Sequence, residues 1–215
     1  MVLQPQQRQK IDAADDALFY GSPRLVTHVD EGFIDGLTQL YRERLPANGR
    51  ILDLMSSWVS HLPEEMAFAH VEGHGMNEAE LARNPRLDRY FCQDLNAHPE
   101  LPLADASFDA VLNAVSIQYL QYPEAVFAQI GRILQPGGVV IVSFSNRMFY
   151  QKAIAAWRDA TDTERIELVK RYFRAAGGFG EPEAIARQSQ VPAVLQLLGA
   201  GGGDPFYAVV AERTA

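Results

Sequence analysis

One segment constrains the fold more than any other: the run Val-Val-Ile-Val-Ser-Phe at residues 139–144 is apolar at five of its six positions. A strand with one solvated face alternates apolar and polar residues, so an apolar run of this length is typical of a strand buried on both faces. The turn Gln-Pro-Gly-Gly at 135–138 separates this run from a helical pattern that ends at Leu134. We therefore expect Gly138–Phe144 to be a central strand of a parallel sheet that helices cover on both faces.

Short apolar runs and helical patterns alternate along the rest of the chain. The other expected strands are Arg50–Leu54, Met66–Val71, Arg89–Cys92, Phe108–Ala114 and Phe206–Ala211. The expected helices are Val26–Leu45, Pro123–Leu134 and Thr161–Ala175. The last helix begins with a capping box that joins Thr161 to Glu164. The alternation predicts a doubly wound α/β fold whose ligands bind beyond the carboxyl ends of the strands.

The length of the chain limits the number of domains. With 215 residues, we expect a polar N-terminal arm over residues 1–25 and a single domain over residues 26–215. Residues 1–16 are rich in glutamine and charge and lack the apolar core of a secretory signal. No run approaches the roughly 18 apolar residues of a membrane span. We therefore expect a cytoplasmic protein that does not associate with membranes. We also expect a monomer or a homodimer.

Charge and metal-binding residue types exclude other function classes. The chain carries 19 Lys and Arg against 27 Asp and Glu, a net charge of −8 that repels a phosphate backbone and disfavours nucleic acid as a partner. A single cysteine, Cys92, cannot form an intramolecular disulfide. His70 and His74 flank Glu72 without a third ligand nearby, and we expect no metal.

Three motifs stand in a distinctive order. They are Ile-Leu-Asp-Leu at 51–54, Asp94 ahead of Leu-Pro-Leu-Ala-Asp-Ala-Ser-Phe-Asp-Ala-Val at 101–111, and Arg-Ile-Leu-Gln-Pro-Gly-Gly at 132–138. Over about residues 30–145 they resemble the class I S-adenosylmethionine-dependent methyltransferases of the small-molecule, type 11 kind. The resemblance implies a Rossmann-like seven-stranded sheet of order 3-2-1-4-5-7-6, mostly parallel, with an antiparallel last strand at Pro205–Glu212.

The resemblance also assigns cofactor-binding roles. It places Asp53 beside the methionine portion of S-adenosylmethionine and Asp94 at the adenine amino group, since a carboxylate accepts hydrogen bonds without donating any. Asp53 has an alternative role as the cap of a following helix. The other implied cofactor-binding residues are Arg24, Met55, Ser56, Ser57, Gly75, Met76, Asn77, Leu95 and Asn113. Arg24 is the candidate partner of the cofactor's carboxylate, and S-adenosylhomocysteine is the implied product.

Two departures from the family pattern concern the cofactor. Relatives usually follow the acid of the first strand with a glycine-rich loop, whereas residues 54–61, Leu-Met-Ser-Ser-Trp-Val-Ser-His, contain no glycine. We expect this loop to take another path, with the hydroxyls of Ser56 and Ser57 toward the cofactor and with Met55 and Trp58 pointing elsewhere. At the end of the second strand, Gly75 stands where relatives carry the acid that holds the ribose. Asn77 can replace it for one ribose hydroxyl.

The acceptor is expected beyond the fourth and fifth strands. Candidate acceptor-binding residues are Tyr20, Gln118, Tyr119, Asn146 and Arg147. Gln118 stands where many relatives carry histidine, so no catalytic base is assigned. Gln118 and Tyr119 are equally consistent with the start of a helix, and Arg147 with a loop residue that caps one.

We therefore expect a methyltransferase, EC 2.1.1.-, that transfers a methyl group to a small molecule of unidentified structure. The alternative is a catalytically inactive methyltransferase-like scaffold, which the two departures favour. A nicotinamide-dependent dehydrogenase is a weaker alternative because Gly-x-Gly-x-x-Gly is absent after the first strand.

Overall fold

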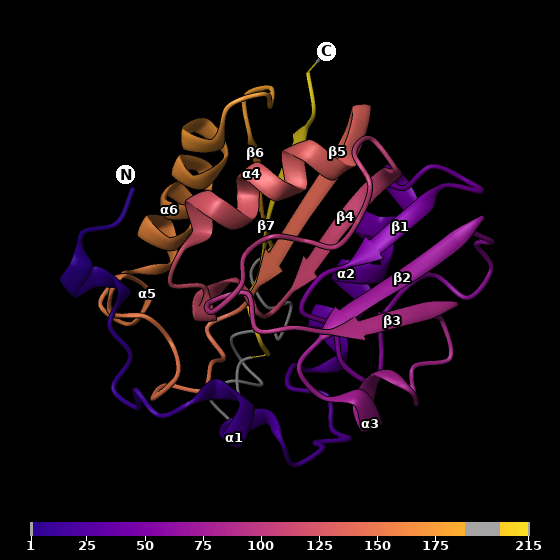
Figure 1. The fold of residues 1–215 in the computed structure, drawn as a ribbon. Coiled ribbons are helices and arrows are strands. Elements are labelled where there is room, and N and C mark those ends of the chain that lie inside the picture. The colour runs from indigo at the N-terminus through magenta and orange to yellow at the C-terminus, as the bar shows by residue number, and fades with distance from the viewer. Residues whose placement is uncertain (1, 188–202, 215) are drawn as a thin grey trace, which may run out of the picture.

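A computed structural model describes residues 2–187 and 203–214. Seven strands form a sheet of order β3-β2-β1-β4-β5-β7-β6 (Figure 1). The strands are β1 Arg50–Asp53, β2 His70–Gly75, β3 Arg89–Cys92, β4 Phe108–Ala114, β5 Leu134–Phe144, β6 Glu183–Arg187 and β7 Phe206–Glu212. Strands β1 to β5 pair in parallel, and β7 is antiparallel to both β5 and β6. The expected fold class, strand order and antiparallel last strand are confirmed.

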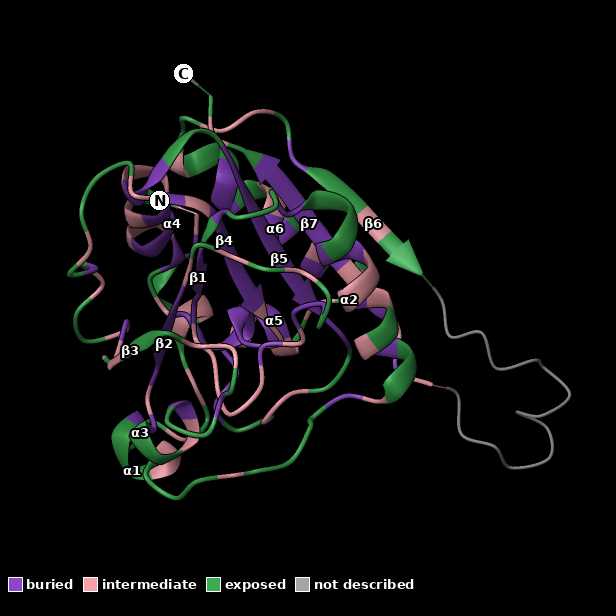
Figure 2. Ribbon diagram, turned by 90° about the vertical axis from the view of Figure 1, so that its right-hand side faces the viewer, coloured by how far each residue is buried: buried purple, intermediate pink, exposed green. Residues whose placement is uncertain are grey.

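Helices cover both faces of the sheet (Figure 1). The longer ones are α2 Glu31–Arg44 on one face, and α4 Pro123–Ile133 and α6 Asp162–Ala176 on the other. The shorter ones are η1 Pro5–Arg8, α1 Asp16–Tyr20, α3 Glu78–Leu81, η2 Ile117–Tyr119 and α5 Ala155–Arg158. Neighbours on β1 face opposite sides: Ile51 belongs to the apolar cluster under α2, and Leu52 to the cluster under α4 and α6. The buried central strands of Figure 2 lie between these two clusters.

The central strand β5 begins earlier than predicted. Its register with β4 shifts between Phe108 and Ala110, which pair with Leu134 and Val139, so the Gln-Pro-Gly-Gly segment forms a bulge within the strand rather than a turn before it. Gly137 has a φ of +79°, a conformation that glycine adopts without strain. The core of β5, residues 140–142, is completely buried, as expected for a strand covered on both faces.

Two predicted boundaries were wrong. The second strand runs over His70–Gly75 instead of Met66–Val71, because its two glycines weaken the apolar pattern although they fit where neighbouring chain segments approach closely. The first long helix begins at Glu31 rather than Val26, because the Asp30 side chain accepts from the backbone N–H of Phe33 at 2.9 Å and caps it.

The N-terminal segment packs against the sheet and the helices. Leu3 is buried, and Arg8 forms an ion pair with Glu124 of α4 at 2.7 Å. Farther along, the backbone oxygen of Gln9 accepts from the N–H of Ala155 at 2.8 Å.

No helix in the described part of the chain is both long enough and apolar enough to cross a membrane.

Candidate functional site

A cavity of about 170 Å³ lies at the carboxyl ends of β1, β2, β3 and β4. Its walls come from the segments that follow these strands and from the N-terminal segment around α1. Strand β1 has β2 on one side and β4 on the other, so the chain reverses its direction of winding here. In open α/β sheets, ligands bind at this switch point.

Asp53, the last residue of β1, lies at the bottom of the cavity with only 3% of its surface exposed. Burial raises the pKa of its carboxyl from 3.8 to about 6, and the hydroxyls of Ser56 and Ser60 oppose this rise. The hydroxyl of Ser56 donates to Oδ2 of Asp53 at 2.6 Å. Within residues 2–187 and 203–214, Asp53 forms no ion pair. It is therefore a buried carboxylate that faces a cavity without a cationic partner.

The loop after β1 makes a tight turn without glycine. Met55 has a φ of +59°, and its backbone N–H donates to Nδ1 of His74 at 3.1 Å. The next N–H, that of Ser56, donates to the backbone oxygen of His74 at 2.6 Å. Met55 packs against the apolar cluster under α4, and the Trp58 indole donates to the backbone oxygen of Val26 at 3.2 Å. Both of these bulky residues line the cavity, as do Ser56 and Ser57.

Beyond β2, Gly75, Met76 and Asn77 also line the cavity. Both N–H groups of the Asn77 amide are engaged within the protein, because they donate to the backbone oxygens of Tyr20 and Gly21 at 2.8 and 3.2 Å, and its oxygen caps α3. One turn farther, Glu80 presents an acid that the sequence reasoning missed.

The Glu80 carboxylate accepts from the backbone N–H of Arg24 and from the Ser57 hydroxyl, both at 2.6 Å. A carboxylate has about four lone-pair sites, so two remain for a ligand. The signal for Glu80 is weak in the sequence, because it lies five residues beyond the strand and only the cap at Asn77 sets its position.

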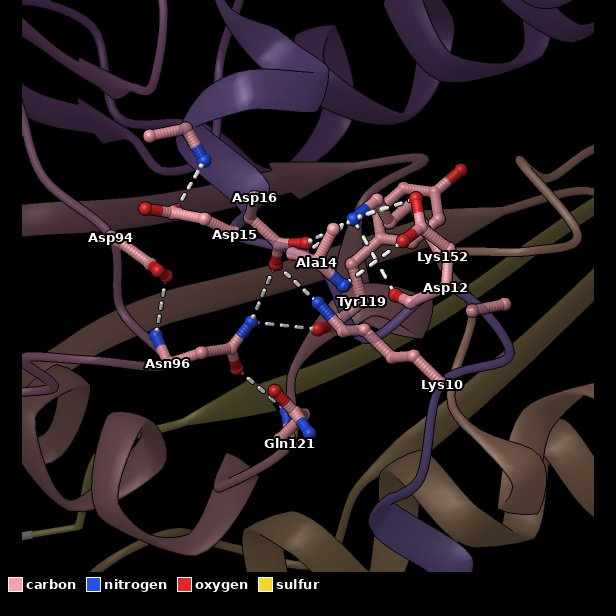
Figure 3. A network of polar contacts seen from close by, with 12 residues as sticks. Lys10, Asp12, Ala14, Asp15, Asp16, Asp94, Asn96, Tyr119, Gln121 and Lys152 are labelled. Carbon is pink, nitrogen blue, oxygen red and sulfur yellow. Dashed lines mark hydrogen bonds and ion pairs between the residues drawn. The ribbon is translucent and has the colours of Figure 1, made fainter.

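Beyond β3, Asp94 and Leu95 reach the same cavity. One carboxylate oxygen of Asp94, Oδ1, accepts from the backbone N–H of Asn96 at 2.8 Å. The Asn96 amide in turn donates to Asp16 of α1 at 3.3 Å and to the backbone oxygen of Tyr119 at 3.1 Å (Figure 3). In the described part of the chain, Oδ2 of Asp94 has no hydrogen-bond partner and remains able to accept from a ligand.

A buried charge cluster ties α1 to Lys152 (Figure 3), and Asp16 and Tyr20 of α1 line the cavity. Lys152 has no exposed surface, and its ammonium lies 3.0 Å from a carboxylate oxygen of Asp12 and 3.2 Å from one of Asp16. Lys10 forms a further ion pair with Asp16. Asp16 lines the cavity, and the two lysines balance its charge. No sequence motif marks this cluster, because Asp16 and Lys152 are 136 positions apart.

Aromatic rings form one side of the cavity mouth, which we call the aromatic rim: Tyr20, Tyr119, Phe149 and His28. The Tyr119 hydroxyl accepts from the backbone N–H of Phe149 at 2.8 Å. The Tyr20 hydroxyl is buried and has no partner among the described residues. The guanidinium of Arg24 lies 5.3 Å from the centre of the Phe149 ring.

The structure leaves four expected site residues outside the cavity lining. Asn113 is buried in β4 and donates to the backbone oxygen of Leu54 at 3.3 Å. Gln118 is buried in η2 and donates to the backbone oxygen of Val115. Asn146 is exposed, and Arg147 forms an ion pair with Asp204 at 2.7 Å.

The histidines noted in the sequence do not form a metal cluster. His70 lies 2.7 Å from Glu72, whereas His74 is turned toward the loop after β1. Among residues 2–187 and 203–214, no group of three His, Cys, Asp or Glu side chains is arranged to hold a metal ion.

Sequence comparison matches residues 60–142 to a family model described as a methyltransferase domain. A malonyl-[acyl-carrier protein] O-methyltransferase of Hahella chejuensis is 31% identical over 115 residues, which are 51% of this chain and 40% of that protein. A probable S-adenosylmethionine-dependent methyltransferase of Mycolicibacterium smegmatis is 43% identical over 87 residues, 40% of this chain and 29% of that protein. The chain thus spans less than half the length of these curated relatives.

Solved structures share the fold. The [4+2]-cyclase SpnF has a TM-score of 0.59 at 19% identity, covering 84% of this chain and 82% of that chain. An S-adenosylmethionine-dependent methyltransferase of Mesorhizobium loti has a TM-score of 0.53 at 20% identity, covering 84% and 100%. Identities this low show the fold alone. The motif order, the domain match and the curated relatives thus make this chain similar to methyltransferases, and the solved structures share its sheet.

Proposed function

We propose that this chain binds S-adenosylmethionine in the cavity at the carboxyl ends of β1 to β4 and transfers its methyl group to a small molecule. The observation that carries the proposal is the buried Asp53 carboxylate, which faces the cavity without a cationic partner in the described chain. Such a group is costly to bury alone, and a ligand ammonium compensates that cost.

The remaining polar groups of the cavity match the rest of this cofactor. Glu80 has free acceptor sites for the ribose hydroxyls, whereas the N–H groups of Asn77 are already engaged within the protein. Asp94 keeps one oxygen for the adenine amino group. Arg24 is the permanent cation of the described lining and can pair with the cofactor's carboxylate. Burial lowers the pKa of both His28 and His61, which favours their neutral forms.

When bound, S-adenosylmethionine supplies an electrophilic methyl group on a sulfonium. The chain's own residues orient an acceptor and exclude water. The aromatic rim provides flat apolar surfaces for the methyl-accepting molecule. The Tyr20 hydroxyl, which has no partner among the described residues, can form a hydrogen bond with that molecule. No general base is needed for an acceptor that is already nucleophilic, because alignment alone can supply roughly 7 to 11 kcal/mol of the barrier.

Titration calorimetry with S-adenosylhomocysteine tests the proposal. We expect one site per chain with micromolar affinity and a loss of about tenfold in Asp94→Asn, since a hydrogen bond to a charged group is removed. Asp35→Asn is the matched control, because Asp35 is exposed on α2 away from the cavity and should leave the affinity unchanged. Absence of heat at millimolar ligand would favour the inactive scaffold. A parallel titration with NAD tests the dehydrogenase alternative.

A further inference from the structure

The turn after β1 adopts a backbone conformation that its residue type disfavours. Met55 lies in the left-handed region, where the Cβ of a non-glycine residue is crowded. The turn positions the hydroxyl of Ser56 on Asp53 and that of Ser57 on Glu80. Some other part of the structure must therefore hold Met55 in this conformation.

His74 makes the contacts that hold this turn. Its Nδ1 accepts from the Met55 N–H at 3.1 Å, and its Nε2 lies 3.0 Å from the backbone oxygen of Gln93. Because a carbonyl can only accept, Nε2 carries the ring proton, and Nδ1 is left as an acceptor. The imidazole thus bridges the turn after β1 to the end of β3.

The environment of His74 stabilises this neutral tautomer. The side chain is 1% exposed, and burial lowers its pKa to about 4, so the ring is neutral across the physiological range. Gly75 shows how closely β2 and the turn approach, because a Cβ at this position would lie 2.6 Å from the backbone oxygen of Ser56. The turn is therefore seated directly on the end of β2.

We propose that His74 is a positioning residue for the cofactor site: its unprotonated Nδ1 holds Met55 in a left-handed turn that glycine would adopt unaided. This inference rests on the proposed function, since it assigns His74 a role in binding S-adenosylmethionine. His74 lines the cavity but acts through the backbone of residues 55 and 56. If this proposal is right, ligand binding should no longer require His74 when residue 55 is glycine.

The experiment is a double-mutant cycle. His74→Phe keeps a ring but removes the acceptor, and we expect it to weaken S-adenosylhomocysteine binding about tenfold in calorimetry. In a Met55→Gly background the same substitution should cost less than threefold. His70→Phe is the matched control, because His70 lies at the start of the same strand and does not line the cavity. An equal loss in both backgrounds, or no loss in either, overturns the proposal.

A second readout needs no ligand. Amide hydrogen exchange at Met55 should accelerate at least tenfold in His74→Phe and remain near the wild-type rate in His70→Phe, as measured by NMR. If the wild-type protein binds no S-adenosylhomocysteine, the proposed function fails, and the exchange result alone decides the role of His74 in the turn. Unchanged exchange at Met55 overturns that role.

If His74→Phe does not fold, His74→Asn provides the second variant. It retains a side-chain acceptor near the Nδ1 position, so Met55 exchange should accelerate less than threefold and ligand affinity should fall less than threefold. Two results together contradict the proposal. The Met55 amide loses its protection from exchange in a folded His74→Asn protein, and adding Met55→Gly does not restore the affinity for S-adenosylhomocysteine.

Discussion

Replacing Asp53 with asparagine should make the protein more stable and less able to bind its ligand. Asparagine keeps the shape of the side chain and removes the charge. The carboxylate is buried at the end of β1 and has no cationic partner in the described chain, so its ionisation is unfavourable in the folded protein. Asp53→Asn relieves this unfavourable term.

The magnitude follows from the pKa. A rise from 3.8 in the unfolded chain to about 6 in the folded protein corresponds to about 3 kcal/mol. Because the folded pKa of this acid is raised, the folded protein binds the proton more tightly, and stability is lost as pH rises from 3.8 through 6. The full loss is present at pH 8 and about half of it at pH 5. Asp53→Asn should therefore gain up to about 3 kcal/mol at pH 8, less what Ser56 loses when its acceptor is neutral.

Urea unfolding at pH 8 and pH 5 measures the effect. The advantage of Asp53→Asn should fall by about half between the two values, while Asp35→Asn should show no pH-dependent difference from wild type. The same variant should bind S-adenosylhomocysteine at least tenfold more weakly. A constant difference in unfolding free energy at the two pH values would refute the reasoning, because it would show that burial does not raise the pKa of Asp53.

Three further predictions concern the same cavity. Lys152→Met should lower the unfolding free energy by about 3 kcal/mol in urea titration, since it removes the buried cation from Asp12 and Asp16; an unchanged midpoint would show that the cluster contributes nothing. Glu80→Gln should weaken S-adenosylhomocysteine binding about tenfold without a comparable loss of stability, and equal affinity would exclude it from the ribose site. At pH 6, binding should release about half a proton from Asp53, detected by calorimetry in buffers of different ionisation enthalpy, and release should vanish in Asp53→Asn.

The parts of the fold that follow from the sequence are those that local patterns determine. The apolar run in β5 and the capping box at Thr161 both indicate their elements directly. The prediction misplaced strand β2 because it contains Gly73, which weakens the apolar pattern. The structure shows why a glycine stands there: a Cβ at this position would come within 2.3 Å of the Leu87 side chain. The linear sequence does not reveal this contact. Strand β6 was missed because it is an edge strand with four of its five residues exposed and thus has no apolar run.

The same distinction applies to the site. Asp53 ends β1 and Asp94 follows β3, both within the quoted motifs, and the structure brings both to one cavity. Glu80 escaped prediction because a helix cap sets its position, and Lys152 because its partners come from the N-terminal segment. Arg147 was expected to bind the methyl-accepting molecule, yet it forms an ion pair with Asp204. The two residues are far apart along the chain, so the sequence pattern does not predict this contact.

Backbone strain is distributed unevenly over the molecule, and its distribution points to the cavity. Five non-glycine residues of the described chain have positive φ values, and three of them line the cavity: Met55, His61 and Val115, at +59°, +53° and +52°. The conformation is least favourable for Val115, a β-branched residue, which the adjacent strand holds through a 2.8 Å bond from its N–H to the backbone oxygen of Ser143. The buried charge of Asp53 lies among the same turns. Packing on both faces of the sheet offsets these unfavourable terms. The strained conformations persist because the surrounding structure fixes them. A ligand that neutralises Asp53 therefore removes one unfavourable term at the place where the others are concentrated.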